Sequence, residues 1–322
     1  MIVVKTPLRI SFTGGGTDFY EHFKNHQSII LTSTINKYIY IILKKRIDDY
    51  IYLNYSSKEV VANSKKIKHE IFKTVLNYFE INNGIEISVI SDIPSKGSGL
   101  GSSSAFTACL IKACCIYKGI KISKKKLAEL TCHIEINLLK KPIGIQDQYA
   151  VSFGGLNILK FNKKLRTVKK VKSKLIYNII KNNSLLLNLE MPRLSETVLK
   201  NHSKLIKNNK TNLINLCKNS EILINSLNKL NINKFCKAIN IGWNEKKKLV
   251  NNISNKFIES EIINAIKYGC IGYKVCGAGN GGYLLLIFKS KMLRRDFYEK
   301  NKKKCLLIEI ENDGTKKVHL KR

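Results

Sequence analysis

The sequence predicts an α+β fold divided into two domains. Its 322 residues suit two domains of ordinary size, or one large α/β domain. Strand-like segments dominate the first 60 residues, helical patterns dominate residues 195–267, and a helix between two strands closes the chain. The change of character falls in a basic stretch, residues 163–183, so we place the two domains at 1–175 and 176–322.

In the first domain, β-branched and aromatic residues predict strands, and apolar residues at helical spacing predict helices. The expected strands cover residues 2–6, 8–13, 28–43, 85–91 and 156–161. The expected helices cover residues 68–79, 103–117 and 123–139, and a loop at 142–150 runs into a short helix. Ser123 is the expected N-cap of the third helix, because its hydroxyl can accept a bond from a free N–H group.

The second domain shows a different pattern. Helices are expected from residue 195 to residue 267, with breaks near Asn208 and Asn231, and again over residues 291–302. The expected strands cover residues 185–189, 271–276, 283–288 and 306–310. A glycine-rich turn joins the second of these strands to the third.

The chain is strongly basic, with 57 Lys and Arg against 23 Asp and Glu and a formal net charge of +34. Such a balance raises the hypothesis of a nucleic-acid-binding protein. However, the lysines are scattered in short runs, and aromatic residues do not interleave with them. We therefore interpret the charge as solvated lysine-rich faces, whose positive field draws anionic small molecules toward a cleft.

The nine cysteines contain no C-x-x-C pair and lie mostly in apolar runs. An odd count of this kind predicts buried free thiols in a reducing cytosol, and no His/Cys cluster has the spacing of a zinc site. No apolar run reaches ~18 residues, and the N-terminus lacks the pattern of a signal peptide. We therefore expect a cytoplasmic protein without a membrane span.

A glycine- and serine-rich segment, PSKGSGLGSSSA at residues 94–105, lies between a predicted strand and a predicted helix. Its glycines allow a tight turn close to an anion, and its serines fall at the helix N-terminus, where free N–H groups favour phosphate. The serine hydroxyls can add donors or a Mg²⁺ ligand. The segment is neither a Walker A loop nor G-x-G-x-x-G, so it predicts a phosphate-binding loop of another kind.

Three further segments carry candidate functional residues. Residues 7–18, PLRISFTGGGTD, join a strand to a glycine turn and an acid, and residues 274–283, KVCGAGNGGY, form a glycine-rich loop between strands. Residues 144–149, GIQDQY, contain Asp147, whose carboxylate can accept the proton of an acceptor hydroxyl or orient that hydroxyl. Glu135 stands twelve residues earlier, on the preceding predicted helix.

These segments, in this order, resemble the motifs of the GHMP kinases over nearly the whole chain, from Pro7 to Phe288. Asn280 stands where the family usually has glycine. The resemblance implies a two-domain fold, with an N-terminal ribosomal-S5-domain-2-like α/β domain and a C-terminal ferredoxin-like α+β domain. It also implies an enzyme that uses ATP and Mg²⁺.

The resemblance further implies roles for individual residues. The expected catalytic residues are Asp147, as the base at the acceptor hydroxyl, and Arg9, beside the reacting oxygen. The expected Mg²⁺ ligands are Ser103 and Glu135. The residues expected to bind the phosphates of ATP are Gly97, Ser98, Gly99, Leu100, Gly101, Ser102, Ser103 and Ser104. Those expected to bind substrate are Thr17, Asp18, Arg193, Lys274, Gly277 and Gly279.

Within the family, G-G-G-T-D and Q-D-Q-Y-A look most similar to the bacterial sugar-1-kinase branch. This implies phosphorylation of the anomeric hydroxyl of D-glycero-D-manno-heptose 7-phosphate, giving the 1,7-bisphosphate for nucleotide-activated heptose and surface polysaccharide. A fucokinase-like or galactokinase-like kinase of another sugar is the alternative, and a basic nucleic-acid-binding protein is an alternative of a different class. The expected partner is a small sugar or sugar phosphate, with no nucleic acid and no membrane, and the expected assembly is a monomer or homodimer.

Overall fold

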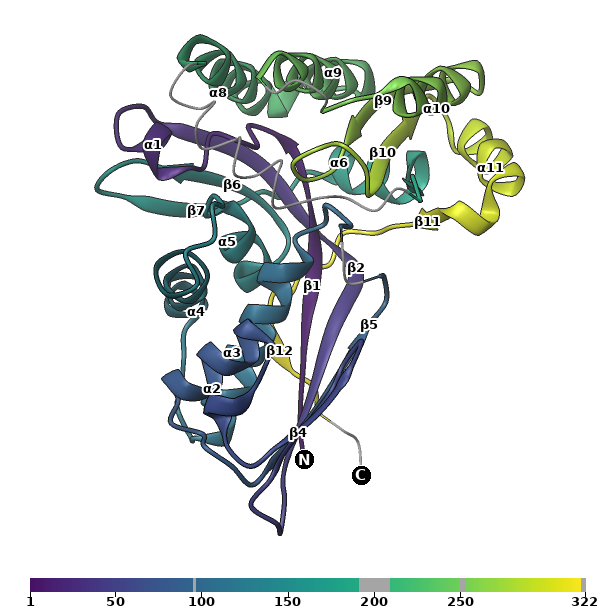
Figure 1. The fold of residues 1–322 in the computed structure, drawn as a ribbon. Coiled ribbons are helices and arrows are strands. Elements are labelled where there is room, and N and C mark those ends of the chain that lie inside the picture. The colour runs from purple at the N-terminus through teal and green to yellow at the C-terminus, as the bar shows by residue number, and fades with distance from the viewer. Residues whose placement is uncertain (95–96, 191–208, 250–252, 320–322) are drawn as a thin grey trace.

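The computed structural model describes residues 1–94, 97–190, 209–249 and 253–319. Two sheets, each with helices packed on it, form the molecule (Figure 1). Arg193 and the expected helical residues 195–208 lie outside the described residues.

The larger sheet is mostly antiparallel, with strand order β12-β1-β2-β5-β3-β4, and β6 pairs with β2 and β7 with β6. Its strands are β1 (Ile2–Thr13), β2 (Ser28–Lys45), β3 (Ile51–Asn54), β4 (Lys58–Val61), β5 (Ile85–Ser91), β6 (Leu156–Phe161), β7 (Arg166–Lys170) and β12 (Lys316–Lys317). The expectation of separate strands at 2–6 and 8–13 is wrong. β1 runs through Pro7, where the register with β2 shifts, because a bulge accommodates a residue without an N–H group.

Helices lie on one face of this sheet, and α3 packs directly on β1 and β2 (Figure 1). The helices are α1 (Tyr20–Phe23), α2 (Glu70–Tyr78), α3 (Ser102–Tyr117), α4 (Lys124–Cys132) and α5 (Gln146–Phe153). Ser123 caps α4 as expected, since its hydroxyl accepts a bond from the Lys126 N–H group. α4 continues as a π-helical turn, His133–Leu138.

The smaller sheet is antiparallel, with strand order β11-β8-β10-β9. Its strands are β8 (Ser184–Asn188), β9 (Cys270–Val275), β10 (Tyr283–Phe288) and β11 (Cys305–Leu307). The helices of this part are α6 (Lys174–Asn178), α8 (Lys210–Asn225), α9 (Ile232–Leu249), α10 (Lys256–Lys267) and α11 (Lys291–Lys300). The expected strand at 306–310 is shorter than predicted: it ends at Leu307, and Ile310 instead forms an isolated bridge with Ile35 of β2.

A shared apolar core joins the two sheets. It includes Leu8 and Phe12 of β1 together with Phe235 of α9 and Leu285 of β10. The last strand, β12, also returns from the second half of the chain to pair with β1. The division at residues 175 and 176 therefore stays a prediction, while the packing fixes the glycine-rich loops of both halves relative to each other.

Two of the broader expectations can be compared with the structure. All nine cysteines are free thiols, and burial raises the pKa of Cys109 to about 12. In the part of the chain that the structure describes, no helix is both long enough and apolar enough to cross a membrane.

Candidate active site

The segment at residues 97–104 forms a tight loop that opens onto a helix N-terminus. Gly97, Gly99 and Gly101 all have left-handed φ angles, of 75°, 73° and 73°, which glycine adopts without strain. α3 begins at the next residue, and no side chain caps it. The free N–H groups and the helix dipole therefore favour a bound anion at this point.

The second glycine-rich loop, residues 277–282, lies against the first. A Cβ atom on Gly282 would stand 2.4 Å from the Gly97 carbonyl oxygen and 2.6 Å from that of Ser98. The Tyr283 N–H group, at the start of β10, donates to the Ser98 carbonyl at 3.1 Å. The second loop therefore holds the predicted phosphate-binding loop in place from the other half of the molecule.

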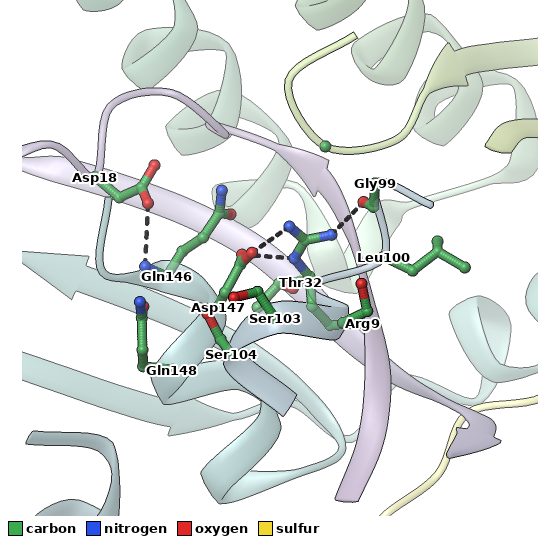
Figure 2. Close-up of polar contacts among 12 residues, drawn as sticks. Arg9, Asp18, Thr32, Gly99, Leu100, Ser103, Ser104, Gln146, Asp147 and Gln148 are labelled. Atoms are coloured by element: carbon green, nitrogen blue, oxygen red, sulfur yellow. Dashed lines mark hydrogen bonds and ion pairs between the residues drawn. The ribbon is translucent and has the colours of Figure 1, made fainter. Parts of the chain in front are cut away.

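Arg9 joins the loop at residues 97–104 to Asp147 (Figure 2). Its Nε atom donates to Asp147 Oδ1 at 2.6 Å, its Nη2 atom to Oδ2 at 2.5 Å, and its Nη1 atom to the Gly99 carbonyl at 2.6 Å. Burial lowers the pKa of Arg9, but the Asp147 carboxylate outweighs it and the net pKa is raised. Arg9 holds the Asp147 carboxylate in place. Because the Asp147 side chain is 23% exposed, a ligand can still reach that carboxylate.

Asp18 lies on the other side of the α5 N-terminus from this pair (Figure 2). Its carboxylate accepts bonds from the backbone N–H groups of Gly16, at 3.1 Å, and Gln146, at 3.0 Å. Burial, followed by the nearby Asp147 charge, raises the pKa of Asp18, although these two N–H groups oppose the shift. Gly144 permits the contact, because a Cβ atom there would stand 2.0 Å from Asp18 Oδ2.

The hydroxyl of Thr17 faces the interior. It donates to the Gly14 carbonyl at 2.8 Å and lies 2.7 Å from the Ser28 hydroxyl. We assign Thr17 to holding the turn that presents Asp18.

Glu135 belongs to the π-helical turn that follows α4, and its fully buried side chain lies against the start of α3. Its Oε1 atom accepts a bond from Ser103 at 2.9 Å, and its Oε2 atom accepts bonds from Ser104 at 2.7 Å and Gln148 at 2.8 Å. The carboxylate thus joins the first turn of α3 to α5. The two residues expected as Mg²⁺ ligands, Ser103 and Glu135, are in direct contact.

Lys141 was not identified from the sequence, although it contacts both of those residues. Its ammonium lies 2.9 Å from the Ser103 hydroxyl and 3.4 Å from Glu135 Oε1. In a chain with 57 Lys and Arg, no local signal distinguishes one lysine from the others. The Lys141 ammonium therefore lies beside the two oxygens expected to hold Mg²⁺.

The remaining residues expected to bind substrate lie in or beside the second loop. Lys274 is buried, donates to the Phe12 carbonyl at 3.2 Å, and has its pKa lowered to about 8 by burial and secondarily by the charge of Arg9. The Gly277 carbonyl accepts a bond from Lys246, and a Cβ atom on Gly279 would stand 2.1 Å from Ile253. The two glycines therefore shape the loop. Among the described residues, no group of three or more His, Cys, Asp or Glu could hold a metal ion.

Two protein-family models match the chain. The model of the GHMP kinases N terminal domain matches residues 53–155, and the model of the GHMP kinases C terminal region matches residues 223–306. Together they cover more than half of the chain, one in each of the two predicted domains.

Curated relatives include two sugar kinases. The D-glycero-alpha-D-manno-heptose 7-phosphate kinase of Campylobacter jejuni is 34% identical over 181 residues, which are 52% of this chain and 52% of that protein. The galactokinase of Thermotoga petrophila is 26% identical over 159 residues, which are 47% of this chain and 43% of that protein. The chain therefore spans about half the length of the curated relatives it matches.

Solved structures resemble the whole chain. The crystal structure of a D-glycero-D-manno-heptose 1-phosphate kinase from Bacteroides thetaiotaomicron has a TM-score of 0.78, with 19% identity and 100% of both chains covered. At this identity the likeness concerns the fold alone. It confirms the predicted two-domain fold of mixed helices and strands.

Proposed function

Because the chain belongs to the GHMP kinase family, we propose that it transfers the γ-phosphoryl group of ATP to a sugar or sugar phosphate. The observation that carries this proposal is the position of Arg9. Its guanidinium binds the Asp147 carboxylate on one side and the Gly99 carbonyl on the other. A carboxylate, a fixed cation and a phosphate-binding loop thus meet at one point, as phosphoryl transfer requires.

The phosphates of ATP would bind in the loop at residues 97–104. The open N-terminus of α3 and the left-handed glycines leave backbone N–H groups near the anion, and the small side chains leave room for it. Lys141 lies beside Ser103 and can contribute a positive charge to the same phosphates.

The acceptor hydroxyl would lie against Asp147. As its oxygen bonds to the γ-phosphorus, the bond from that phosphorus to the β-phosphate oxygen breaks, and ADP leaves. The proton of the hydroxyl passes to the Asp147 carboxylate, which retains lone pairs beyond those used by Arg9. Arg9 lies between the acid and the loop, where negative charge develops on the transferred group.

Ser103 and Glu135 fit a Mg²⁺ site by their chemistry. Both supply oxygen atoms, and Mg²⁺ in such sites takes one or two carboxylates together with substrate phosphates. The Lys141 ammonium contacts both oxygens, which supports the choice of this position for a cation. A bound Mg²⁺ would neutralise charge on the phosphates of ATP.

For the acceptor, we propose the anomeric hydroxyl of D-glycero-D-manno-heptose 7-phosphate, which would give the 1,7-bisphosphate. Two observations support this choice: the Q-D-Q-Y-A segment at 146–150 and the 34% identity to the Campylobacter jejuni heptose 7-phosphate kinase. Arg193 and Lys274 are the proposed partners of the substrate phosphate. The galactokinase match makes an unphosphorylated sugar the second candidate.

The test is a substrate panel with ATP and Mg²⁺, measuring ADP release and phosphorylated product. The panel includes D-glycero-D-manno-heptose 7-phosphate, D-mannose, D-galactose and L-fucose. We expect turnover with heptose 7-phosphate. The new phosphate should be on the anomeric hydroxyl, and the original phosphate should remain on the sugar when the product is treated with acid. If only galactose or fucose gives a product, that sugar replaces heptose 7-phosphate as the proposed acceptor. If no sugar gives a product, the kinase proposal fails.

Asp18→Asn is expected to weaken sugar binding about 10- to 100-fold, because a charge-assisted hydrogen bond to a hydroxyl is lost. The raised pKa of Asp18 gives the wild-type enzyme the same defect at low pH, because the carboxyl becomes protonated as pH falls through that pKa. KM for the sugar should therefore rise in the wild type as pH falls through the raised pKa of Asp18. In the variant, KM for the sugar should be high at every pH. A wild-type KM for the sugar that does not change with pH contradicts the assignment, and KM for ATP is measured alongside as the control.

A further inference from the structure

Two buried polar side-chain atoms, one on β1 and one on α5, have no hydrogen-bond partner among the described residues. The hydroxyl oxygen of Ser11 and the amide oxygen of Gln146 both lie away from solvent and form no hydrogen bond among the described residues. Ser11 itself is only 8% exposed. A buried polar atom without a partner typically costs about 1–3 kcal/mol, so each of these groups calls for an explanation.

The two groups converge on the same point. A Cβ atom built on Gly15 would stand 3.1 Å from the Ser11 hydroxyl oxygen and 3.8 Å from the unpaired amide oxygen of Gln146. The first of these contacts is tighter than an ordinary Cβ contact, so a side chain at position 15 would crowd the Ser11 hydroxyl. Glycine at position 15 leaves the hydroxyl and the amide uncovered by a side chain of that residue, and these two groups together can both donate and accept hydrogen bonds.

The chain places each of these groups next to a residue of the proposed catalytic pair. Ser11 follows Arg9 by two residues on β1, in regular register with β2, so both side chains project from the same face of the strand. Gln146 directly precedes Asp147 at the start of α5. Figure 2 shows the Gln146 side chain between Asp18 and the Arg9–Asp147 pair.

We propose that Ser11 and Gln146, together with Asp18, form a subsite that recognises neighbouring hydroxyl groups of the acceptor sugar. This inference rests on the proposed kinase function and specifies which part of the substrate binds here. Asp18 contributes a carboxylate that can accept bonds from sugar hydroxyls, and Ser11 and Gln146 contribute groups that can both donate and accept.

The subsite is closed in this structure, since Ser11 and Asp18 are both buried. Sugar binding therefore requires the surrounding chain to open. The bound hydroxyls then supply the partners that Ser11 and Gln146 lack, which gives a sugar an advantage over an apolar ligand.

The test uses Ser11→Ala and Gln146→Met, which remove the polar atoms and preserve most of the volume. The backbone bond from Gln146 to Asp18 is unaffected by the second substitution. Ser152→Ala is the matched control: its hydroxyl is also buried without a partner, but it lies at the other end of α5. All variants are compared by the thermal midpoint of the ligand-free protein and by steady-state kinetics with ATP and heptose 7-phosphate, galactose or mannose, whichever the wild type phosphorylates.

We expect all three variants to keep or raise the thermal midpoint, because each removes an unsatisfied polar atom. Ser11→Ala and Gln146→Met should raise KM for the sugar about 3- to 10-fold, the range for one lost neutral hydrogen bond, and leave KM for ATP unchanged. Ser152→Ala should change neither constant. With monodeoxy analogues of the same sugar, the penalty of each variant should disappear for one analogue, which lacks the hydroxyl that the side chain contacts.

Three outcomes overturn the subsite. One is a lower thermal midpoint with unchanged sugar kinetics, which would show that the two groups are structural. Another is a penalty that persists for every deoxy analogue, and the third is an equal effect of Ser152→Ala on KM for the sugar. If the wild type phosphorylates no sugar at all, the kinase proposal fails instead. The thermal midpoints alone then decide whether Ser11 and Gln146 are unpaired.

Discussion

Replacing Asp147 with asparagine is expected to lower kcat about 10²- to 10⁴-fold, the usual contribution of a positioned general base. The amide cannot take the proton of the acceptor hydroxyl, and it cannot hold both nitrogens of Arg9 as the carboxylate does. ATP should still bind with nearly normal affinity, because Asp147 reaches the loop through Arg9, whose bond to the Gly99 carbonyl does not itself involve this carboxylate. Single-turnover rates and nucleotide titrations separate these two effects.

The chain offers a matched control for the broken ion pair. Arg46 holds Asp48 in the same two-bond geometry, at 2.8 Å and 2.6 Å, at the end of β2. Asp48→Asn should therefore leave kcat unchanged. If Asp147→Asn also has the wild-type kcat, Asp147 has no part in proton transfer, whatever its effect on the thermal midpoint.

The features that could be predicted from sequence are those determined by neighbouring residues. Glycine at positions 97, 99 and 101 followed by serines predicts a turn and a helix start, because only local backbone preferences are involved. Ser123 as a cap is a prediction of the same kind. Both are independent of how the distant parts of the chain pack.

The features that could not be predicted depend on distant pairing. Arg9 and Asp147 were each expected at the site, but their ion pair joins residues 138 positions apart. β12 is a strand only because the short polar segment Lys316–Lys317 pairs with Val4 and Lys5, and its own sequence has no strand pattern. The burial of Glu135 likewise follows from a π-helical turn that helical periodicity does not reveal.

The same distinction explains why the acceptor side of the site was incompletely predicted. Asp18 is recognisable because it ends a conspicuous glycine turn. Ser11 and Gln146 have no such signal, since a serine in a strand and a glutamine at a helix start are ordinary residues. They become candidates only when the fold leaves them buried without partners on either side of Gly15.

Gly101→Val is expected to lower kcat/KM for ATP by at least about 100-fold, because it displaces Arg9, which joins the loop to the acid. A Cβ atom on Gly101 would stand 3.0 Å from Arg9 Cγ and 3.3 Å from its Nε atom, and the two valine methyl groups extend further. Misplacement of a catalytic group by about 1 Å can cost about 10²-fold in rate.

Strain at a left-handed residue is a separate effect, and Gly119 controls for it. Gly119 has a φ angle of 72°, against 73° for Gly101, and a Cβ atom there would have no neighbour within 4 Å. Gly119→Val should therefore lose a similar amount of stability, since both substitutions force a β-branched residue into the same backbone region, and should keep its activity. Thermal midpoints and kcat/KM for both variants give the comparison. Equal activity losses in the two would mean that general destabilisation, and not the displacement of Arg9, accounts for the effect at Gly101.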